Sequence, residues 1–234
     1  MSNQTLLITG ADGGLGITVT ETLLAAGFSL VAATRDEQAS ERLANAFPSH
    51  MHRSLQAVPA DLSIEADVLR FMETANGVSG LVHLAGGYTH GDRISDYSVA
   101  DFDHLFALNT KPTFLLLKHV MPLLKQNGSG SIVTIGAKPA LHPVSGNAVY
   151  TASKSAVIAL TLSAAEEGRK HGVRANCIVP AALQTPGNLS WASKEQFDTF
   201  TPLQDVADTI AWLMSDAGKG ITGTVIPMYH KMPS

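Results

Sequence analysis

The chain has 234 residues, of which 45% are hydrophobic and 15% charged, with a formal net charge of -4 at pH 7. This composition favours a large buried core, excludes a disordered chain, and gives no basic footprint for nucleic acid. A single cysteine, Cys177, excludes an internal disulfide framework, and we find neither a secretory signal nor an apolar stretch of the roughly 18 residues that a membrane span needs. We therefore expect a cytoplasmic protein with no membrane partner.

Short apolar runs alternate with longer helical patterns along the whole chain. Near-continuous apolar strands separated by helices indicate a parallel sheet that is covered on both faces. With right-handed crossovers, this predicts an α/β fold, a Rossmann-type doubly wound sheet of seven parallel strands in one domain, 1–234. The predicted strands cover 5–10, 29–34, 55–62, 80–87, 130–137, 173–181 and 223–228. The predicted helices cover 16–27, 36–47, 65–75 and 102–126, the last broken near 109–112, and another begins at 148.

A glycine-rich turn joins the first predicted strand to the first predicted helix. In "TGADGGLG", Gly10, Gly14 and Gly16 follow the spacing GxxxGxG. Glycines let the backbone turn sharply and approach a diphosphate closely, and the helix N-terminus supplies N–H groups. The spacing is not the commonest dinucleotide fingerprint, GxGxxG, and no P-loop sequence follows. The turn therefore predicts a dinucleotide site, with a purely structural turn as the alternative.

The end of the second predicted strand bears on the choice of nucleotide. Dinucleotide sites often place an acid here to hold both ribose hydroxyls, but this chain has Thr34 followed by Arg35. A guanidinium can clamp a 2′-phosphate, which a carboxylate would repel. We therefore expect NADP(H) to be favoured over NAD(H). Two alternatives remain: Arg35 as a solvated loop cation, and Asp36 as a competing acid.

A phenol and an ammonium lie four residues apart in "AVYTASKSAVIAL", 148–160. On a helix, Tyr150 and Lys154 share one face. A phenol with a pKa of about 10 is a poor acid or base at neutral pH. An ammonium one turn away is expected to stabilise its anion, which makes Tyr150 a candidate acid–base group. The alternative is a surface pair that contributes little.

The order of these motifs resembles the short-chain dehydrogenase/reductase family over essentially the whole chain. TGxxxGxG at 9–16 is followed by Asp61, LAGG at 84–87, Asn109, Tyr-x-x-x-Lys at 150–154 and PAALQT at 180–185. The resemblance implies an NAD(P)-dependent oxidoreductase acting on a small carbonyl, alcohol or conjugated ring, and a homodimer or homotetramer. The alternative is a nucleotide-sensing or scaffold protein that kept the fold and lost turnover.

The resemblance also implies roles for particular residues. Tyr150 would exchange a proton with the substrate, Lys154 would hold the nicotinamide ribose, and Asn109 would anchor a water for proton relay. The irregular stretch 183–204 would form a loop over the site. The cofactor-binding residues it implies are Gly10, Asp12, Gly13, Gly14, Leu15, Gly16, Thr34, Arg35, Asp61, Leu62, Ala85, Gly86, Gly87, Tyr150, Lys154, Pro180, Leu183 and Thr185.

The chain departs from the family pattern at two positions. Ala137 stands where the family usually has a serine that donates to the substrate oxygen, and Leu84 replaces the usual asparagine before Ala-Gly. Both departures, together with "GAK" at 136–138 and Thr-Pro-x-Asn at 185–188, resemble the dihydropteridine reductases, which reduce a conjugated quinonoid ring. The NADH preference of those enzymes does not fit Arg35.

Polar residues near Ala137 are candidates to replace the missing hydroxyl: Lys138, Ser145 and Asn147. We expect His83 to be a hydrogen-bonded strand residue and Cys177 a buried structural thiol. The nine histidines show no HxxxH spacing and there is no CxxC, so no metal site is expected.

Overall fold

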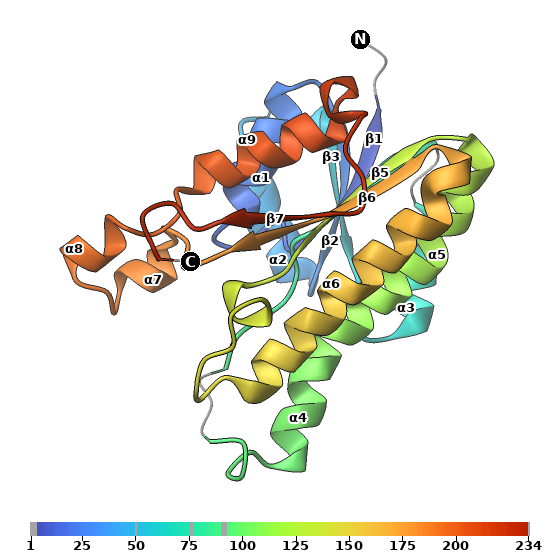
Figure 1. The fold of residues 1–234 in the computed structure, drawn as a ribbon. Helices are drawn as coiled ribbons and strands as arrows, with labels where there is room; N and C mark the ends of the chain where they lie inside the picture. Colours follow the sequence, from blue (N-terminus) through green and yellow to red (C-terminus); the bar gives the residue numbers. More distant parts are fainter. Residues whose placement is uncertain (1–3, 50, 75–76, 90–92, 234) are drawn as a thin grey trace.

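The computed structural model describes residues 4–49, 51–74, 77–89 and 93–233. Its strands form one parallel sheet of seven strands in the order β3-β2-β1-β4-β5-β6-β7, which confirms the predicted fold class (Figure 1). The predicted strands are confirmed, although most end earlier than expected. They are β1 (Thr5–Thr9), β2 (Ser29–Thr34), β3 (Leu55–Pro59), β4 (Val78–His83), β5 (Gly130–Ile135), β6 (Val173–Pro180) and β7 (Thr224–Met228).

Helices cover both faces of the sheet: α1, α2 and α9 lie on one face, and α3, α5 and α6 on the other (Figure 1). The helices are α1 (Gly16–Ala25), α2 (Glu37–Asn45), α3 (Glu65–Glu73), α4 (Val99–Leu105), α5 (Lys111–Asn127), α6 (Ala148–Gly168), α7 (Pro186–Leu189), α8 (Lys194–Phe197) and α9 (Leu203–Met214). Short 3-10 turns are η1 (Met51–Ser54), η3 (Lys138–Ala140), η4 (Arg169–His171) and η5 (Asp216–Gly218). Residue 75, the last of the predicted helix 65–75, lies outside the described residues.

Each strand contributes to two hydrophobic cores. In β1, Leu6 and Ile8 pack beneath α1 and α9, whereas Leu7 packs on the opposite face beneath α3 and α5. Successive side chains of a strand point to opposite faces, and here both faces are buried. This arrangement explains why the strands have near-continuous apolar sequences.

The long helix predicted over 102–126 is interrupted, as expected. A π-helical turn, η2 (Phe106–Thr110), separates α4 from α5. Pro112 sits in the first turn of α5, where its missing N–H is tolerated. The hydroxyl of Thr113 donates to the carbonyl oxygen of Asn109 at 2.8 Å. The irregular turn therefore carries Asn109 and keeps its carbonyl satisfied.

The expectation that no segment is long and apolar enough to span a membrane is wrong for α6 with η4. By length and composition alone, Ala148–His171 passes that test among the described residues. However, α6 packs against β6 and α5, it buries Ile158 and Ala165 in the cores, and its Val157 is also buried. Packing on the sheet accounts for its apolar sequence.

Candidate active site

A cavity of about 650 Å³ opens at the carboxyl ends of β1, β2, β3 and β4. Many of the residues predicted to bind a cofactor line it, namely Gly10, Asp12, Gly13, Gly14, Leu15, Gly16, Thr34, Arg35, Asp61, Leu62, Ala85 and Gly86. Sequence reasoning did not identify the other lining residues, which are Ala33, Ala60, Ser63, Leu84, His104, Ala107, Leu108 and Pro112. Four of these, His104, Ala107, Leu108 and Pro112, belong to α4, η2 and α5. They line the cavity because these elements cross above the strand ends.

The glycine turn forms a cradle without side chains. Gly10 has φ +69°, and a Cβ there would lie 2.8 Å from the backbone nitrogen of Ala85. A Cβ on Gly16 would lie 1.9 Å from the carbonyl oxygen of Gly10, so no larger residue fits. Helix α1 begins at Gly16, so its N-terminus borders the cavity, and this geometry fits a dinucleotide diphosphate.

Polar contacts at the end of β2 separate the roles of its candidate residues. The carboxylate of Asp36 accepts from the backbone nitrogen of Ala39 at 2.7 Å and so caps α2. Asp36 is therefore engaged by the helix, whereas Arg35 is exposed and lines the cavity. A second guanidinium, Arg42, lies 4.0 Å from the carboxylate of Asp12, also a lining residue.

Asp61 follows β3, the strand next to β2, and also lines the cavity. Its carboxylate accepts from the backbone nitrogen and the hydroxyl of Ser63, at 2.9 and 2.7 Å. These bonds, with the charge of Lys111, lower the pKa of Asp61. The carboxylate is thus held ionised in a fixed turn.

Tyr150 and Lys154 both lie on α6, but their expected electrostatic coupling is not found. Burial raises the pKa of Tyr150 to about 12, and the neighbouring Tyr88 adds to this rise. Burial also lowers the pKa of Lys154 to about 8. The ammonium donates to the carbonyl oxygen of Ile135 at 3.1 Å, so it is directed at the end of β5. The role of Lys154 in stabilising the Tyr150 anion stays a prediction.

Lys154 instead lies beside Gly86, a residue that lines the cavity, although Lys154 itself is not among the lining residues. A Cβ on Gly86 would lie 3.0 Å from Nζ of Lys154 and 2.6 Å from Oδ1 of Asn109. Lys154 is only 6% exposed. Asn109 and Lys154 of the candidate catalytic set therefore meet at Gly86, in the turn after β4. The third member, Tyr150, lies one helical turn from Lys154 on α6.

The side-chain amide of Asn109 clamps that turn to α6. Its nitrogen donates to the carbonyl oxygen of Gly87 and to the hydroxyl of Ser153, at 3.0 and 3.1 Å, and its oxygen accepts from the Gly87 nitrogen at 2.9 Å. Ser153 in turn donates to the carbonyl oxygen of Tyr150 at 2.8 Å. Asn109 therefore fixes the positions of the β4 turn and the catalytic helix relative to one another.

His83 belongs to a buried chain of hydrogen bonds next to this clamp. Its Nδ1 lies 2.7 Å from the hydroxyl of Thr9, and its Nε2 lies 3.0 Å from the hydroxyl of Thr113. Because Thr113 donates to Asn109, the Thr113 hydroxyl accepts from Nε2–H. Burial and the charge of Lys154 lower the pKa of His83 to about 3. His83 is thus a neutral, hydrogen-bonded strand residue in the structure.

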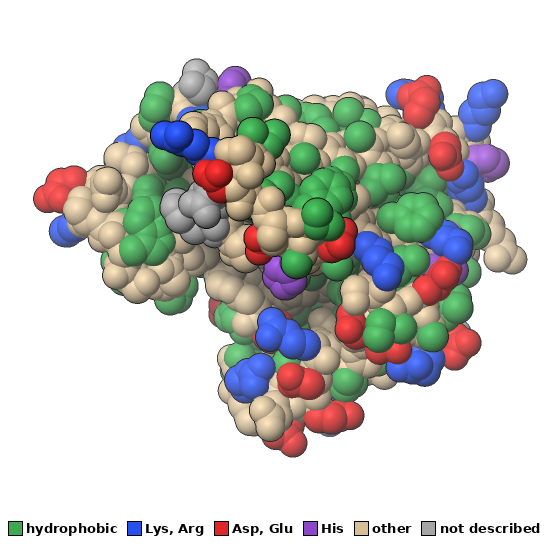
Figure 2. Space-filling view, turned by 90° about the horizontal axis from the view of Figure 1, so that it is seen from below, with side chains coloured by type: hydrophobic (Ala, Val, Ile, Leu, Met, Phe, Trp, Pro, Cys, Tyr) green, Lys and Arg blue, Asp and Glu red, His purple; other side chains and the backbone are tan. Residues whose placement is uncertain are grey.

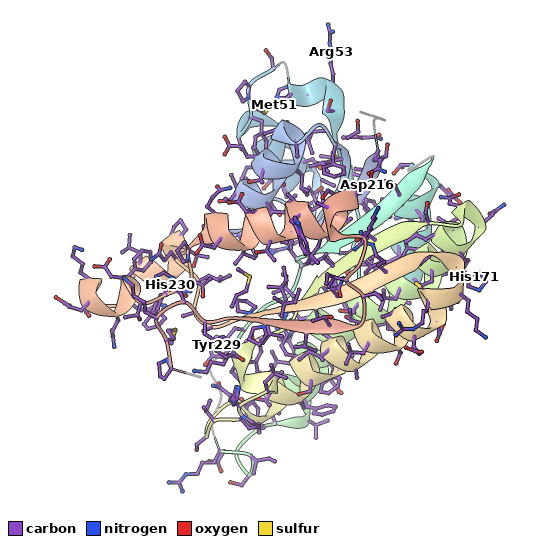
Figure 3. The ribbon with its side chains drawn as sticks, turned by 45° about the horizontal axis from the view of Figure 1, so that its top comes forward. Met51, Arg53, His171, Asp216, Tyr229 and His230 are labelled. Atoms are coloured by element: carbon purple, nitrogen blue, oxygen red, sulfur yellow. The ribbon has the colours of Figure 1, made fainter. Side chains whose placement is uncertain are left out.

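Ala137 has no hydroxyl of its own, and two of the candidate replacements are engaged elsewhere or exposed. Ala137 is buried. Lys138 donates to the carbonyl oxygen of Pro233, and its Nζ lies 5.2 Å from the ring centre of Tyr229, in the segment after β7 (Figure 3). Ser145 is exposed. Lys138 is therefore engaged with the C-terminal segment.

Two aromatic rings meet beside the start of α6. The rings of Tyr88 and Tyr150 pack edge to face with centres 4.9 Å apart. The Tyr88 hydroxyl donates to Oδ1 of Asn147 at 3.0 Å. The sequence alone does not show this contact, since no local pattern reports a contact between residues 62 positions apart.

The stretch 183–204 folds into α7 and α8 and returns beside its own start. Leu183 pairs with Thr201, and Thr185 caps α7 through the backbone nitrogen of Asn188. Methyl and Cβ atoms of Thr185 face Gly14, so this residue borders the glycine cradle. Pro180 is the last residue of β6 and is buried. Figure 2 shows hydrophobic side chains gathered at the end formed by α7 and α8, where Leu189 and Trp191 are exposed.

Cys177 is a buried free thiol of β6, and burial raises its pKa. Across the residues that the structure describes, no group of three or more His, Cys, Asp or Glu side chains is arranged to hold a metal ion.

Comparison with known proteins gives a consistent family. The short chain dehydrogenase family model matches residues 4–196. YtkK of Bacillus subtilis (strain 168), an oxidoreductase by name, is 33% identical over 239 residues, covering 94% of this chain and 92% of YtkK. The 7alpha-hydroxysteroid dehydrogenase of Bacteroides fragilis is 30% identical, covering 96% of this chain and 92% of that protein.

A solved structure agrees in fold over nearly the whole length. The 3-ketoacyl-(acyl-carrier-protein) reductase from Brucella melitensis, complexed with NADH, superposes with a TM-score of 0.87 at 27% identity, covering 96% of each chain. The glycine cradle, the Asn109–Tyr150–Lys154 arrangement and these matches lead to one conclusion. The chain belongs to the short-chain dehydrogenase/reductase family and is an NAD(P)-dependent oxidoreductase of that type.

Proposed function

We propose that the protein transfers hydride between NADP(H) and a small carbonyl, alcohol or conjugated ring, with Tyr150 as the acid–base group. The observation that carries the proposal is the position of Lys154 and Asn109 around Gly86, at the rim of the glycine-turn cavity. This arrangement puts a cation beside a residue that lines the cavity, with the phenol of Tyr150 one helical turn from that cation.

The nicotinamide, when bound, supplies or accepts the hydride. Tyr150 donates the accompanying proton from its Oη to the substrate oxygen during reduction, and accepts it in the reverse direction. Because burial raises the pKa of Tyr150 to about 12, the phenol holds its proton at neutral pH and starts as the acid. Lys154 is charged below its lowered pKa of about 8 and is suited to hold the ribose hydroxyls of the cofactor.

The preference for NADP(H) is supported by the charges at the end of β2. Arg35 lines the cavity, while Asp36 is occupied in capping α2. Arg42 pairs with Asp12 and so offsets the one carboxylate of the glycine turn. A dianionic 2′-phosphate gains from both guanidinium groups, whereas the 2′-hydroxyl of NAD does not. Affinities for NADPH and NADH measured by fluorescence titration test this preference, and tighter NADH binding contradicts it.

Two substrate classes are proposed. A ketone or secondary alcohol is supported by the names of the relatives, a hydroxysteroid dehydrogenase and a ketoacyl reductase. A quinonoid dihydropterin, as in the dihydropteridine reductases, is favoured by Ala137. A conjugated ring delocalises the developing charge and depends less on a hydroxyl donor at that position.

The experiment is a turnover assay with purified protein. NADPH oxidation is followed at saturating cofactor with a panel of ketones and with quinonoid dihydropterin, and NADP reduction is followed with alcohols. Turnover with any member that is lost in Tyr150→Phe supports the proposal. Binding of NADPH without turnover across the panel supports the sensor or scaffold alternative.

The proposed setting is a cytoplasmic homodimer or homotetramer without nucleic-acid or membrane partners. Its support is the exposed apolar side chains before and along α4 and α5, where Ile94 and Val99 are 78% and 77% exposed and Phe102 and Phe114 lie on the helix surfaces. Light scattering of the purified protein tests the assembly, and a monomer at micromolar concentration contradicts it.

A further inference from the structure

We infer that the side-chain amide of Asn147, held in place by Tyr88, replaces the hydroxyl that Ala137 lacks. It would donate a hydrogen bond to the substrate atom that Tyr150 protonates. This inference rests on the proposed oxidoreductase function and deepens it by naming a catalytic donor, Asn147, and a positioning residue, Tyr88.

The first support is the unusual use of Asn147. It occupies the N-cap position of α6, where asparagine ordinarily accepts a hydrogen bond from the backbone. Its side chain makes no capping bond here. Oδ1 instead accepts from the Tyr88 hydroxyl at 3.0 Å. For Nδ2, no hydrogen-bond partner occurs within the described part of the chain, so both of its N–H groups remain to donate.

The second support is the location of this pair. Asn147 precedes Tyr150 by three residues and so lies close to it at the first turn of α6. The ring of Tyr88 packs edge to face on Tyr150 at 4.9 Å, with 84° between the ring planes. Tyr88 also contributes to the raised pKa of Tyr150, which places the two phenols within electrostatic reach. The amide is therefore anchored directly beside the acid–base group.

The other polar side chains near Ala137 are directed elsewhere or exposed. Lys138 is bound to Pro233 and packs over Tyr229. Ser155 donates to the carbonyl oxygen of Ala140 at 3.3 Å. Ser145 is exposed in the loop before α6. Asn147 is the candidate whose donors remain and whose acceptor is fixed by a residue that touches Tyr150.

The chemistry requires a donor that is not consumed. In reduction, hydride adds to the substrate carbon, the carbon–oxygen or ring double bond opens onto its heteroatom, and that atom takes the proton from Oη of Tyr150. An amide N–H of Asn147 stabilises the developing negative charge on the same atom and keeps its own proton. Removal of one such donor typically lowers turnover by about 10²–10³-fold.

The test uses the full-length protein with a substrate that the wild type reduces. Asn147→Ala is expected to lower kcat by about 10²-fold while leaving NADPH affinity unchanged. Asn147→Asp keeps the acceptor for Tyr88 but removes the donors, so it is expected to lose as much. Tyr88→Phe releases the amide without removing it, so its kcat is expected to lie between those of the wild type and Asn147→Ala. Ser145→Ala, in the same loop, is the matched control and should match the wild type.

The decisive variant restores the family hydroxyl. Ala137→Ser in the Asn147→Ala background is expected to recover at least tenfold in kcat, because the two donors serve the same atom. An Asn147→Ala variant that keeps wild-type kcat overturns the inference, and so does a double variant with no recovery, while both leave the proposed function standing. Absence of wild-type turnover overturns the proposed function and this inference with it.

Discussion

Lys154 donates to the carbonyl oxygen of Ile135 across 3.1 Å, in a site where the ammonium is nearly inaccessible to water. This bond ties the catalytic helix to the carboxyl end of β5 and turns the charge toward Gly86 and the cavity. The phenol of Tyr150, one helical turn away, keeps a pKa raised to about 12. We therefore expect separable roles for the two residues, Lys154 toward the cofactor and Tyr150 toward the substrate.

Replacing Tyr150 and Lys154 one at a time should separate effects on NADPH binding from effects on turnover. Tyr150→Phe removes the proton donor without removing charge, so kcat is expected to fall by about 10²–10⁴-fold with little change in NADPH affinity. Lys154→Ala is expected to weaken NADPH binding and lower kcat together. Fluorescence titration and steady-state kinetics give both quantities. Tyr229→Phe and Lys170→Ala are matched controls outside the cavity, and normal turnover in both active-site variants would refute the assignment.

The lowered pKa of Lys154 predicts a pH dependence of cofactor binding. The side chain is protonated below about pH 8 and neutral above it. NADPH affinity in the wild type is expected to decline as pH rises from 7 to 9.5, because the ammonium is lost. Titrations across this range in wild type and Lys154→Ala measure the effect. An equal decline in the variant would show that another group is responsible.

His83 should give the fold an acid-sensitive stability. Its pKa is about 3 in the folded chain and about 6.5 in the unfolded chain, so the unfolded state binds more protons between these values. The stability is fully present above pH 6.5 and is lost as pH falls, at about 1.4 kcal/mol per pH unit. Because carboxylates titrate at lower pH, the change in stability between pH 6.5 and 4.5 reports mainly on His83.

Urea unfolding across that window compares the wild type with His83→Asn. The variant loses the bonds to Thr9 and Thr113 and is expected to be less stable at pH 7, with a flatter slope toward acid. His142→Gln, on an exposed loop, serves as the control for the loss of a titrating ring. A slope in His83→Asn as steep as in the wild type would contradict the assignment.

The fold was predictable because its signals are local. Buried parallel strands such as β1 are apolar on both faces, and the glycine spacing from Gly10 to Gly16 is set by contacts within a single turn. The direction of the Lys154 side chain was not predictable, because helical spacing gives the face of a side chain but not its partner. Ile135 is 19 residues away, on another element.

The same limit applies to the rest of the site. Asn109 was identified by its place among the motifs, but its clamp on Gly87 and Ser153 depends on how η2 sits over β4 and α6. The apolar sequence of α6 is compatible both with a membrane span and with a helix packed on a sheet. Only the tertiary structure distinguishes these two possibilities. Tyr88 and Asn147 meet through the β4 turn, which no periodicity describes.

Charge at the end of β2 should set the choice of cofactor. Arg35→Asp is expected to lower NADPH affinity by more than tenfold and to leave NADH affinity equal or improved, since a carboxylate repels the 2′-phosphate. Arg42→Ala leaves the carboxylate of Asp12 unpaired and is expected to weaken NADPH binding to a smaller extent. Arg53→Ala is the control, because Arg53 lies in η1, before the start of β3, and does not line the cavity at the carboxyl ends of the strands. Equal losses for both nucleotides in Arg35→Asp would rule out phosphate recognition.

Gly86 offers a test of the cavity rim that removes no titrating group from the chain. In Gly86→Ala the new Cβ would lie 2.6 Å from Oδ1 of Asn109 and 3.0 Å from Nζ of Lys154, so both side chains must move. NADPH affinity and kcat are expected to fall together, by about tenfold or more, since displacement of a positioning group by an ångström costs catalysis heavily. Gly220→Ala meets no atom within 4 Å and is the matched control for a glycine replacement. If Gly86→Ala binds and turns over like Gly220→Ala, then Lys154 and Asn109 do not act at this rim.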